Sequence, residues 1–432
     1  MNKGWKNGRV GELISSLESG ISVNGEGGTP ADDDYAVLKV SAVTYGRFNP
    51  KASKKISGHE YQRAKCIPKK DQIIISRSNT PALVGASCYV EKDYPNRFLP
   101  DKLWQITPHR KKEVEHKWLA YFLASPWARF RLSKLATGTS NSMKNITKSE
   151  LLTLPVPIPP LPEQKNIASF LECWDSAIEK TEALIALKSQ SRELSANRLL
   201  FGQNRILDPN SNPKYQKTKW FKAPHDWSIT KIQDIASEVV ARNSCESTHT
   251  VLSCSKHVGF VESLKYFKKK VYSDNTENYK IIKYGEFGYP SNHIEEGSIG
   301  LQNLCEIGIV SPIYTVFQVN DKKISSDFLY KLLKTNTYRH IFQVSTSSSV
   351  DRRGSLRWKE FSKIEIPLPS LDEQTAIANT INIFDREITI LKQLLENYRL
   401  QKRGLMQKLL TGEWQVNITT KATEEVSKAV NA

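Results

Sequence analysis

Residue patterns that bind metals are absent from the sequence. None of the six cysteines belongs to a Cys-x-x-Cys pair, so neither a zinc cluster nor a disulfide framework is indicated. The eight histidines form no His-x-x-x-His pair. We therefore expect reduced, partly buried thiols, solvated or core imidazoles, and no metal. The cysteines are Cys66, Cys88, Cys173, Cys245, Cys254 and Cys305.

Catalytic motifs are equally scarce. The chain has no G-x-x-x-x-G-K-[ST] loop, no G-x-G-x-x-G turn and no G-x-S-x-G elbow. Ile158-Pro159-Pro160-Leu161 has the two prolines of an adenine methyltransferase site, Asn/Asp-Pro-Pro-aromatic, but lacks the amide or acid and the aromatic residue. Asp321-Lys322-Lys323 lacks the acidic partner of a nuclease site and is interpreted as a solvated charge cluster. We expect a chain that is not an enzyme.

Positive charge is concentrated in two parts of the chain. The formal net charge is +17, and an excess of this size usually serves a polyanion such as nucleic acid. Residues 1–150 carry 25 basic and 14 acidic side chains, and residues 207–360 carry 22 and 16. Residues 151–206 balance at 6 and 6, and residues 361–432 at 9 and 9. Nucleic-acid binding is therefore expected in the two basic segments.

Length and composition indicate a multidomain globular protein. The 432 residues suggest two or three domains, and 39% hydrophobic with 25% charged residues excludes a largely disordered chain. No run approaches the roughly 18 to 20 apolar residues of a membrane helix, and residues 1–10 lack the apolar core of a signal peptide. We expect a cytoplasmic location.

The chain contains an internal repeat at an offset of 210 residues. Val156-Pro157-Ile158-Pro159 returns as Ile366-Pro367-Leu368-Pro369, and Leu161-Pro162-Glu163-Gln164 returns as Leu371-Asp372-Glu373-Gln374. The match ends where Leu199-Leu200-x-Gly202 aligns with Leu409-Leu410-x-Gly412. Upstream, the correspondence is looser: Trp5 recurs as Trp227. The two copies therefore share the repeated motifs, and the residues between those motifs differ.

Each repeat contains a long helix with an apolar seam. Pro162 is expected at the first helical position, and Ser370-x-x-Glu373 has the spacing of a capping box. About 38 residues per helix correspond to roughly 57 Å. The seam period of 3.5 residues predicts an antiparallel coiled coil between the two copies; the alternative is that each helix packs on its own domain. The seam residues are Ile167, Leu171, Trp174, Ile178, Ile185 and Leu199 in the first copy and Ile377, Ile381, Phe384, Ile388, Leu391, Leu395, Tyr398, Leu405 and Leu409 in the second, where Lys402 also falls in register.

Polar residues interrupt the first seam, so its pairing is expected to be loose between Lys188 and Ser195. The interrupting residues are Thr181, Lys188, Arg192 and Ser195.

The basic segments combine strands with short closing helices, which predicts an α+β class in duplicate. The expected organisation is 1–150 and 207–360 for the two basic domains, 151–206 and 361–414 for the helical spacers, and 415–432 for a disordered tail. Expected strands are 35–40, 72–76, 103–107, 250–254 and 313–319, and expected short helices are 118–124 and 328–333.

The duplicated Pro-rich strand, the Leu-x-Glu-Gln helix start and the closing Leu-Leu-x-Gly resemble the specificity subunit of type I restriction-modification systems. The resemblance covers almost the whole chain. It implies that the basic segments are target recognition domains, each reading one half of a bipartite DNA site. It also implies that the helices form a coiled coil that sets the spacing and docks two methyltransferase subunits.

DNA-binding candidates are polar or basic residues in loops that flank the strands. Arg and Asn can pair with base edges, whereas Lys more often meets phosphates; surface solvation is the alternative for any single residue. In the first domain the candidates are Lys54, Lys55, Arg77, Ser78, Asn79, Thr80, Thr137, Thr139, Ser140 and Asn141. In the second they are Lys256, His257, Lys268, Lys269, Lys270, Ser291, Asn292, His293, Ser347, Ser348, Arg352 and Arg353.

The resemblance also implies the partners: double-stranded DNA, two methyltransferase subunits, and in some complexes restriction subunits. No cofactor is expected on this chain, and S-adenosylmethionine is expected on the methyltransferase subunit. Two other hypotheses remain open: a coiled-coil scaffold that does not bind DNA, and a self-sufficient DNA-cutting or recombining enzyme. The base sequence recognised does not follow from the sequence.

Overall fold

The structure is a computed structural model that describes residues 4–26, 28–44, 46–109, 113–138, 143–243, 249–347 and 354–415. The chain divides into two compact units, residues 1–183 with 392–432 and residues 184–391. Two helices of 40 residues, α6 (Leu161–Leu200) and α11 (Leu371–Leu410), each contribute one half to each unit. This division cuts across the four segments expected from the sequence. The predicted tail lies outside the described residues beyond 415.

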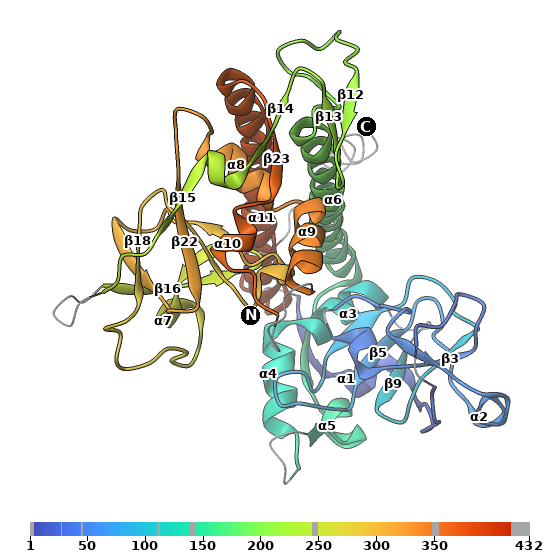
Figure 1. Cartoon of the computed structure of the whole chain (residues 1–432). Coiled ribbons are helices and arrows are strands. Elements are labelled where there is room, and N and C mark those ends of the chain that lie inside the picture. Colours follow the sequence, from blue (N-terminus) through green and yellow to red (C-terminus); the bar gives the residue numbers. More distant parts are fainter. Residues whose placement is uncertain are drawn as a thin grey trace. The chain divides into compact units, whose positions relative to one another are not determined.

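Unit 1 contains two sheets and a pair of short ones (Figure 1). A four-stranded sheet has the order β2-β9-β5-β7 and a three-stranded sheet the order β4-β3-β8; β1 pairs with β11, and β6 with β10. The strands are β1 (Lys6–Arg9), β2 (Ile14–Ser19), β3 (Ala36–Leu38), β4 (Ser53–Lys55), β5 (Ile73–Ser76), β6 (Ser78–Asn79), β7 (Ser87–Tyr89), β8 (Arg97–Phe98), β9 (Leu103–Pro108), β10 (Lys144–Asn145) and β11 (Pro155–Ile158). The helices are α1 (Val10–Leu13), η1 (Val40–Val43), α2 (Gly58–Arg63), α3 (His116–Ala124), α4 (Pro126–Leu135) and α5 (Lys148–Leu152).

Unit 2 repeats the theme with two four-stranded sheets, β15-β22-β19-β20 and β17-β16-β21-β18; β12 pairs with β13, and β14 with β23. Its strands are β12 (Tyr215–Lys217), β13 (Lys222–Pro224), β14 (Ser228–Lys231), β15 (Ala236–Val239), β16 (Thr250–Ser255), β17 (Gly259–Glu262), β18 (Lys280–Lys283), β19 (Phe287–Pro290), β20 (Gly300–Leu301), β21 (Ile307–Val310), β22 (Tyr314–Val319) and β23 (Glu365–Leu368). Its helices are η2 (Ile232–Asp234), α7 (Ser263–Tyr266), η3 (Ile294–Glu296), α8 (Ser326–Leu333), α9 (Asn336–Ser347) and α10 (Trp358–Phe361).

The expected strands and short helices are confirmed in position. The five runs become β3, β5, β9, β16 and β22, and the two short helices become α3 and α8. The Pro-rich runs form β11 and β23, whose partners β1 and β14 lie just after Trp5 and Trp227 in the sequence. In both units, therefore, an early strand that follows a tryptophan pairs with the Pro-rich strand that precedes the long helix.

Each core is completed by the end of the other repeat's helix. Met406, Leu409 and Leu410 of α11 pack in the core of unit 1 with Trp5 and Trp118. In unit 2, the corresponding end of α6 does the same: Ala196, Leu199 and Leu200 pack with Trp227 and Phe328. Burial of these side chains stabilises each unit by roughly 1.5–3 kcal/mol per large residue.

The helix starts differ in detail from the sequence expectation. Helix α6 begins at Leu161, so Pro162 occupies the second position. Of the two hydrogen bonds in the capping box predicted at Ser370, one forms: the Glu373 backbone N–H donates to Ser370 Oγ at 3.3 Å. The prediction is wrong for the second, because the Glu373 carboxylate faces the core, where it accepts from Trp227 and Arg205. The Gln side chain of the Leu-x-Glu-Gln motif instead links the end of the Pro-rich strand to the start of the short closing helix. Gln374 Nε2 donates to Pro369 O, after β23, and Gln374 Oε1 accepts from Ser325 N, before α8.

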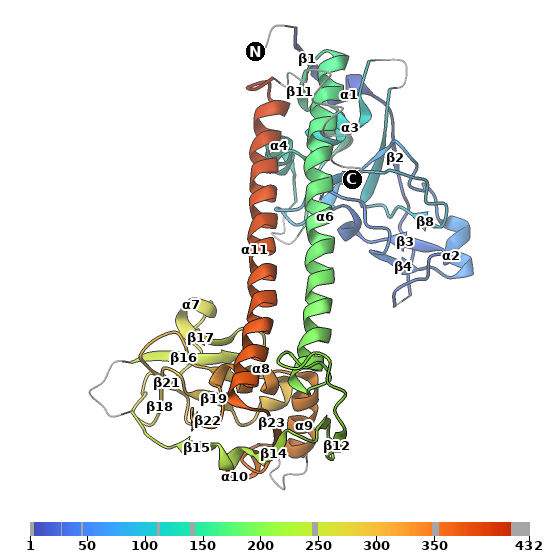
Figure 2. The same ribbon diagram turned by 90° about the horizontal axis from the view of Figure 1, so that it is seen from above.

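Helices α6 and α11 pack side by side in antiparallel orientation within each unit (Figure 2). Trp174 and Tyr398 make an edge-to-face contact with ring centroids 5.7 Å apart, which rules out two separately packed helices. All fifteen predicted seam residues are buried or half-buried. Ile167 and Leu171, like Ile377 and Ile381, also belong to the globular cores.

The polar stretch of the first seam is held by ion pairs rather than loosely packed. Lys188 Nζ lies 2.7 Å from Glu387 Oε1, and Arg192 Nε lies 2.8 Å from Asp385 Oδ1. The expectation of a loose seam between Lys188 and Ser195 is therefore wrong at these two positions, because α11 supplies carboxylates opposite them.

Candidate nucleic-acid interface

One backbone hydrogen bond joins the candidate loops in each unit. Arg77, which follows β5, accepts from Ile146 N at 2.9 Å, and Ser291, which follows β19, accepts from Leu356 N at 2.8 Å. Strands β5 and β19 pair with β9 and β22, respectively. The loop after a sheet strand therefore lies beside the segment that precedes the closing Pro-rich strand in both units, as loops positioned on a rigid sheet commonly do at binding sites.

Arg77 is held by stacking and by its backbone. Its guanidinium lies 5.8 Å from the Trp104 ring centroid, and its backbone N–H donates to Lys102 O at 3.0 Å. Its buried Nε has no hydrogen-bond partner, and Arg77 takes part in no ion pair among the described residues. A guanidinium without a carboxylate partner keeps its donors for an external acceptor.

The other candidates of this loop surround Arg77. Strand β6, Ser78–Asn79, pairs with β10, and Thr137 exchanges two backbone hydrogen bonds with Asn145 at 2.9 and 2.8 Å. Ser78 is buried, Asn79 is half-buried, and Thr80 and Thr137 are exposed. The structure thus brings Arg77–Thr80 and Thr137 together; Thr139, Ser140 and Asn141 lie outside the described residues.

Lys54 and Lys55 belong to a different sheet of unit 1, on β4. Both are exposed, and Lys55 Nζ lies 2.7 Å from Asp34 Oδ1. The hydrogen bond with Asp34 raises the pKa of Lys55. Of these two lysines, Lys54 alone forms no ion pair among the described residues.

In unit 2 the loop after β19 meets the turn after β16. Ser291 is buried and donates to Ile313 O at 2.9 Å, whereas His293 is exposed and lies 3.7 Å from Glu296. Lys256, beside the exposed His257, lies 3.9 Å from Glu296. Asn292 Oδ1 is buried without a partner among the described residues. These two candidate groups therefore form one surface.

Acidic residues also lie on this surface. His293, Glu295 and Glu296 place one potential ligand atom each within 4.8 Å of one another. Because Lys256 pairs with Glu296, an ion-pair cluster accounts for the arrangement, and we assign no metal to it.

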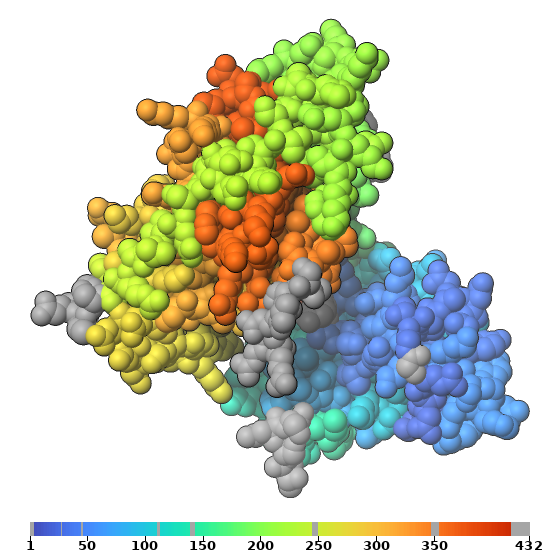
Figure 3. Space-filling view, in the orientation of Figure 1, coloured from blue at the N-terminus to red at the C-terminus, as the bar shows by residue number. Residues whose placement is uncertain are grey.

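Lys268, Lys269 and Lys270 follow α7 and are exposed, in a segment whose residue numbers are coloured yellow in the space-filling view (Figure 3). Lys270 lines a groove of about 460 Å³, and its ammonium lies 5.1 Å from the Tyr272 ring centroid. Tyr314, which also lines the groove, is the cross-strand partner of Pro290, so the groove adjoins Ser291. Lysines beside aromatic rings are typical of surfaces that contact nucleic acid.

Sequence reasoning missed the tyrosines of this groove. Tyr272 could have been found, because it stands two residues after the lysine run. Tyr279 and Tyr314 carry no such signal, since only folding places them beside Lys270. Of the last predicted group, Ser347 ends α9 with its side chain not described, and Ser348, Arg352 and Arg353 lie outside the described residues.

Two divergent, basic recognition surfaces on a repeated frame, joined by paired long helices, define a protein with two separate binding modules. The sequence profile of the "Type I restriction modification DNA specificity domain" matches residues 2–188 and 224–397. The chain belongs to this family, which confirms the resemblance of the repeated motifs and the duplicated α+β class with paired long helices.

Individual relatives agree. The chain is 25% identical over 318 residues to the type I restriction enzyme MjaVIII specificity subunit of Methanocaldococcus jannaschii, covering 71% of this chain and 72% of that protein. Its fold is similar to that of the type I restriction-modification S subunit from M. genitalium, with a TM-score of 0.53 and 17% identity over 97% of this chain and 98% of the other. A chain from a structure concerning complex assembly and conformational transition of the type I R-M system gives a TM-score of 0.56 and 16% identity, covering 95% and 98%.

None of these comparisons supports the scaffold alternative. The family is that of specificity subunits, which are generally not catalytic. Among the described residues, no helix combines the length and the apolar character that crossing a membrane requires.

Proposed function

We propose that this chain is the DNA-specificity subunit of a type I restriction-modification complex. Each basic region reads one half of a bipartite site, and the paired helices set the gap between the halves. Segregated positive charge and family membership support this function. A cytoplasmic location, beside DNA, follows from it.

The observation that carries the proposal is the repeated loop pairing. Arg77 with Ile146 and Ser291 with Leu356 occupy equivalent places on equivalent strands, yet the side chains around them differ. A repeated frame with different side chains gives two binding surfaces of related geometry and different base preference. The proposed site therefore consists of two unlike half-sites.

The chemistry belongs to the partners in this proposal. Two methyltransferase subunits dock along the helices and bring S-adenosylmethionine, and restriction subunits complete complexes that cleave DNA. Apolar side chains exposed on both helices, such as Leu187 and Leu194 on α6 and Ile383 and Ile390 on α11, offer contact area for these subunits; each is 56–68% exposed.

The test is a pair of insertions that lengthens α6 and α11 at positions opposite each other. Seven residues inserted after Ala186 and seven after Thr389 keep the 3.5-residue seam in phase and add about 10 Å, or about three base pairs at about 3.4 Å each. Lengthening α6 alone, for example by four residues inserted between Ser189 and Ser191, is less suitable than this paired insertion, because it would separate Arg192 from Asp385. Methylation by the assembled complex is measured on sites of graded spacing.

The preferred gap should grow by about three base pairs while both half-site sequences stay the same. Seven residues inserted at Asn210, in an exposed loop, provide the control and should change neither. A fixed optimum, or altered half-sites, would contradict the proposal. The purified chain alone, given DNA, magnesium and methyl donor, should neither methylate nor cut, and methyl transfer by it would overturn the assignment of catalysis to the partners.

A further inference from the structure

A polar cluster joins three helices in unit 1. Asp175 of α6 accepts from Lys402 Nζ of α11 at 2.6 Å through Oδ1 and from Tyr121 Oη of α3 at 2.7 Å through Oδ2. The carboxylate therefore ties the two long helices to each other and both of them to the short helix that closes the first recognition region.

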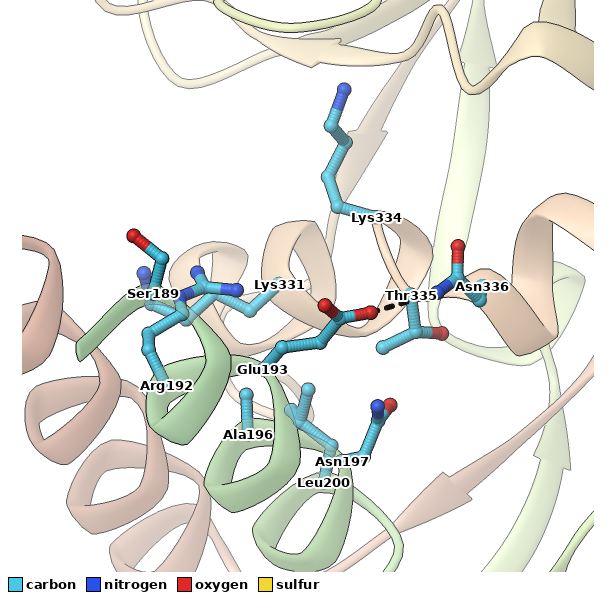
Figure 4. A pocket seen from close by; sticks show the side chains of 10 residues that line it. All are labelled: Ser189, Arg192, Glu193, Ala196, Asn197, Leu200, Lys331, Lys334, Thr335 and Asn336. Carbon is cyan, nitrogen blue, oxygen red and sulfur yellow. Dashed lines mark hydrogen bonds between the residues drawn. The ribbon is translucent and has the colours of Figure 1, made fainter. Parts of the chain in front are cut away.

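The same three positions form a cluster in unit 2, each shifted by 210 residues. Asp385 of α11 accepts from Arg192 Nε of α6 at 2.8 Å and from Arg192 Nη2 at 3.1 Å, and Lys331 Nζ of α8 lies 3.5 Å away. Figure 4 shows Arg192 and Lys331 at one side of a pocket of about 270 Å³. At the other side, Asn336, at the start of α9, donates to Glu193 Oε1 at 2.9 Å. Different cations thus converge on an equivalent aspartate.

The Lys402–Asp175 pair is the least exposed ion pair between the long helices among the described residues, with side chains that are 17% and 30% exposed. The Arg192–Asp385 pair is as exposed as the Lys188–Glu387 pair, but Asp385 also lies beside Lys331 of α8, whose side chain is 7% exposed. Burial lowers the pKa of Lys402, which shows that its ammonium is largely withdrawn from water. Leaving such a charge without its partner costs far more than breaking a surface pair.

The apolar seam alone does not fix how the helices align. Apart from Lys402, apolar or aromatic residues recur every seven residues along the α11 seam, so between the cores a slip of one heptad would again bury such side chains. The register therefore depends on the helix ends that pack in the two cores and on the polar pairs between them. The same slip in one direction would leave Lys402 and Arg192 opposite Ala168 and Ala378. In the other direction Lys402 would meet Glu182, but Arg192 would meet the like charge of Lys392. Polar pairs at seam positions are a known means of selecting one register at some cost in stability.

We propose that Asp175 and Asp385 are specificity-determining residues that fix the register of α6 against α11 and the seating of each recognition region on the helices. This inference rests on the proposed function, because the register then determines the gap between half-sites. A slip of one heptad moves one helix along the other by about 10 Å, which corresponds to about three base pairs.

The register can be measured without DNA. Spin labels at Ala186 and Thr389, both exposed and both in unit 2, are introduced in a cysteine-free background of the full chain. The wild-type chain should give one distance distribution in double electron–electron resonance. In Asp175→Asn/Asp385→Asn, a second population should appear, displaced along the helices by about 10 Å.

The DNA readout is the methylation of sites of graded spacing by the assembled complex. For the double variant, methylation at gaps about three base pairs from the optimum should rise at least fivefold relative to the optimum. The exchange Asp175→Lys/Lys402→Asp keeps the charge pair and should restore most of the discrimination. Glu360→Gln, which breaks the exposed pair with Lys363, is the matched control and should leave the gap preference unchanged.

A single spin-label distance and an unchanged gap preference in the double variant, with only a lower melting temperature, would overturn the proposal. If the double variant does not fold, each single variant and the charge exchange are measured in its place. The proposal would also be overturned if the charge exchange lost the gap preference to the same extent as the single variants. Failure of the proposed function is distinct, since the wild-type complex would then show no preferred gap.

Discussion

The indole Nε1 of Trp227 donates a hydrogen bond to the Glu373 carboxylate at 3.1 Å, at the start of α11. Glu373 also accepts two hydrogen bonds from Arg205, at 2.5 and 2.8 Å. In unit 1, Trp5 donates to Glu163 at 2.9 Å, but no arginine takes the place of Arg205 among the described residues. The Leu-x-Glu-Gln motif therefore anchors each helix to the first residues of its unit.

Glu373→Gln should destabilise unit 2 by about 2 kcal/mol, because the side chains of Glu373 and Arg205 are only 4% and 12% exposed and Arg205 would keep only its pair with the more exposed Asp226. Glu163→Gln should cost about 1 kcal/mol, the difference between a hydrogen bond to a carboxylate and one to a neutral amide oxygen. Urea unfolding followed by tryptophan fluorescence measures both. Equal losses in the two variants would refute a special contribution of Arg205.

The glycines that end the two repeats should differ in their tolerance of alanine. Both have positive φ, +67° for Gly202 and +75° for Gly412, so either substitution costs about 1 kcal/mol in backbone strain. A Cβ at Gly202 would lie 2.5 Å from Pro224 Cγ, whereas one at Gly412 would lie 3.3 Å from Trp5. Gly202→Ala should therefore lower the melting temperature more, as calorimetry can test; the reverse order would contradict the packing described.

Leu395→Lys should weaken the pairing of α6 and α11, because Leu395 is 8% exposed and an unpaired charge at a buried position costs several kcal/mol. The matched control is Ile390→Lys on the same helix, where Ile390 is 56% exposed and little change is expected. Thermal unfolding and binding to the full bipartite site are the measurements. If Leu395→Lys bound the full site with unchanged affinity, the paired helices would not be needed for recognition.

Arg77 and the lysine run should affect DNA binding differently. Replacing Lys268 and Lys269 by alanine should weaken binding to all sequences alike and reduce the slope of log K against log salt by up to about 2. Arg77→Ala should relax specificity at one position of one half-site, at about 1–3 kcal/mol. Titrations at several salt concentrations, with specific and scrambled sites, separate the two effects. An unchanged salt slope in the lysine variant would remove these residues from the interface.

Much of the architecture could be predicted because it repeats. The offset of 210 residues, the seam of α11 and the concentration of charge depend on residue order and spacing, which need no knowledge of contacts. The first candidate loop could also be placed, since Arg77 follows the strand that the apolar run 72–76 predicts, whereas the strand before Ser291 was not predicted. Which of these residues contact DNA stays a prediction.

What only the tertiary structure decided is how distant groups meet. The sequence by itself determined two copies of one frame, because periodicity and motif spacing are local properties of the chain. It did not show that the Glu373 carboxylate faces Trp227 rather than its own helix cap, that Asp175 lies opposite Lys402, or that Tyr314 lies beside Lys270. Such contacts depend on the packing of elements far apart in the sequence, and burial then determines which of several available partners each polar group takes.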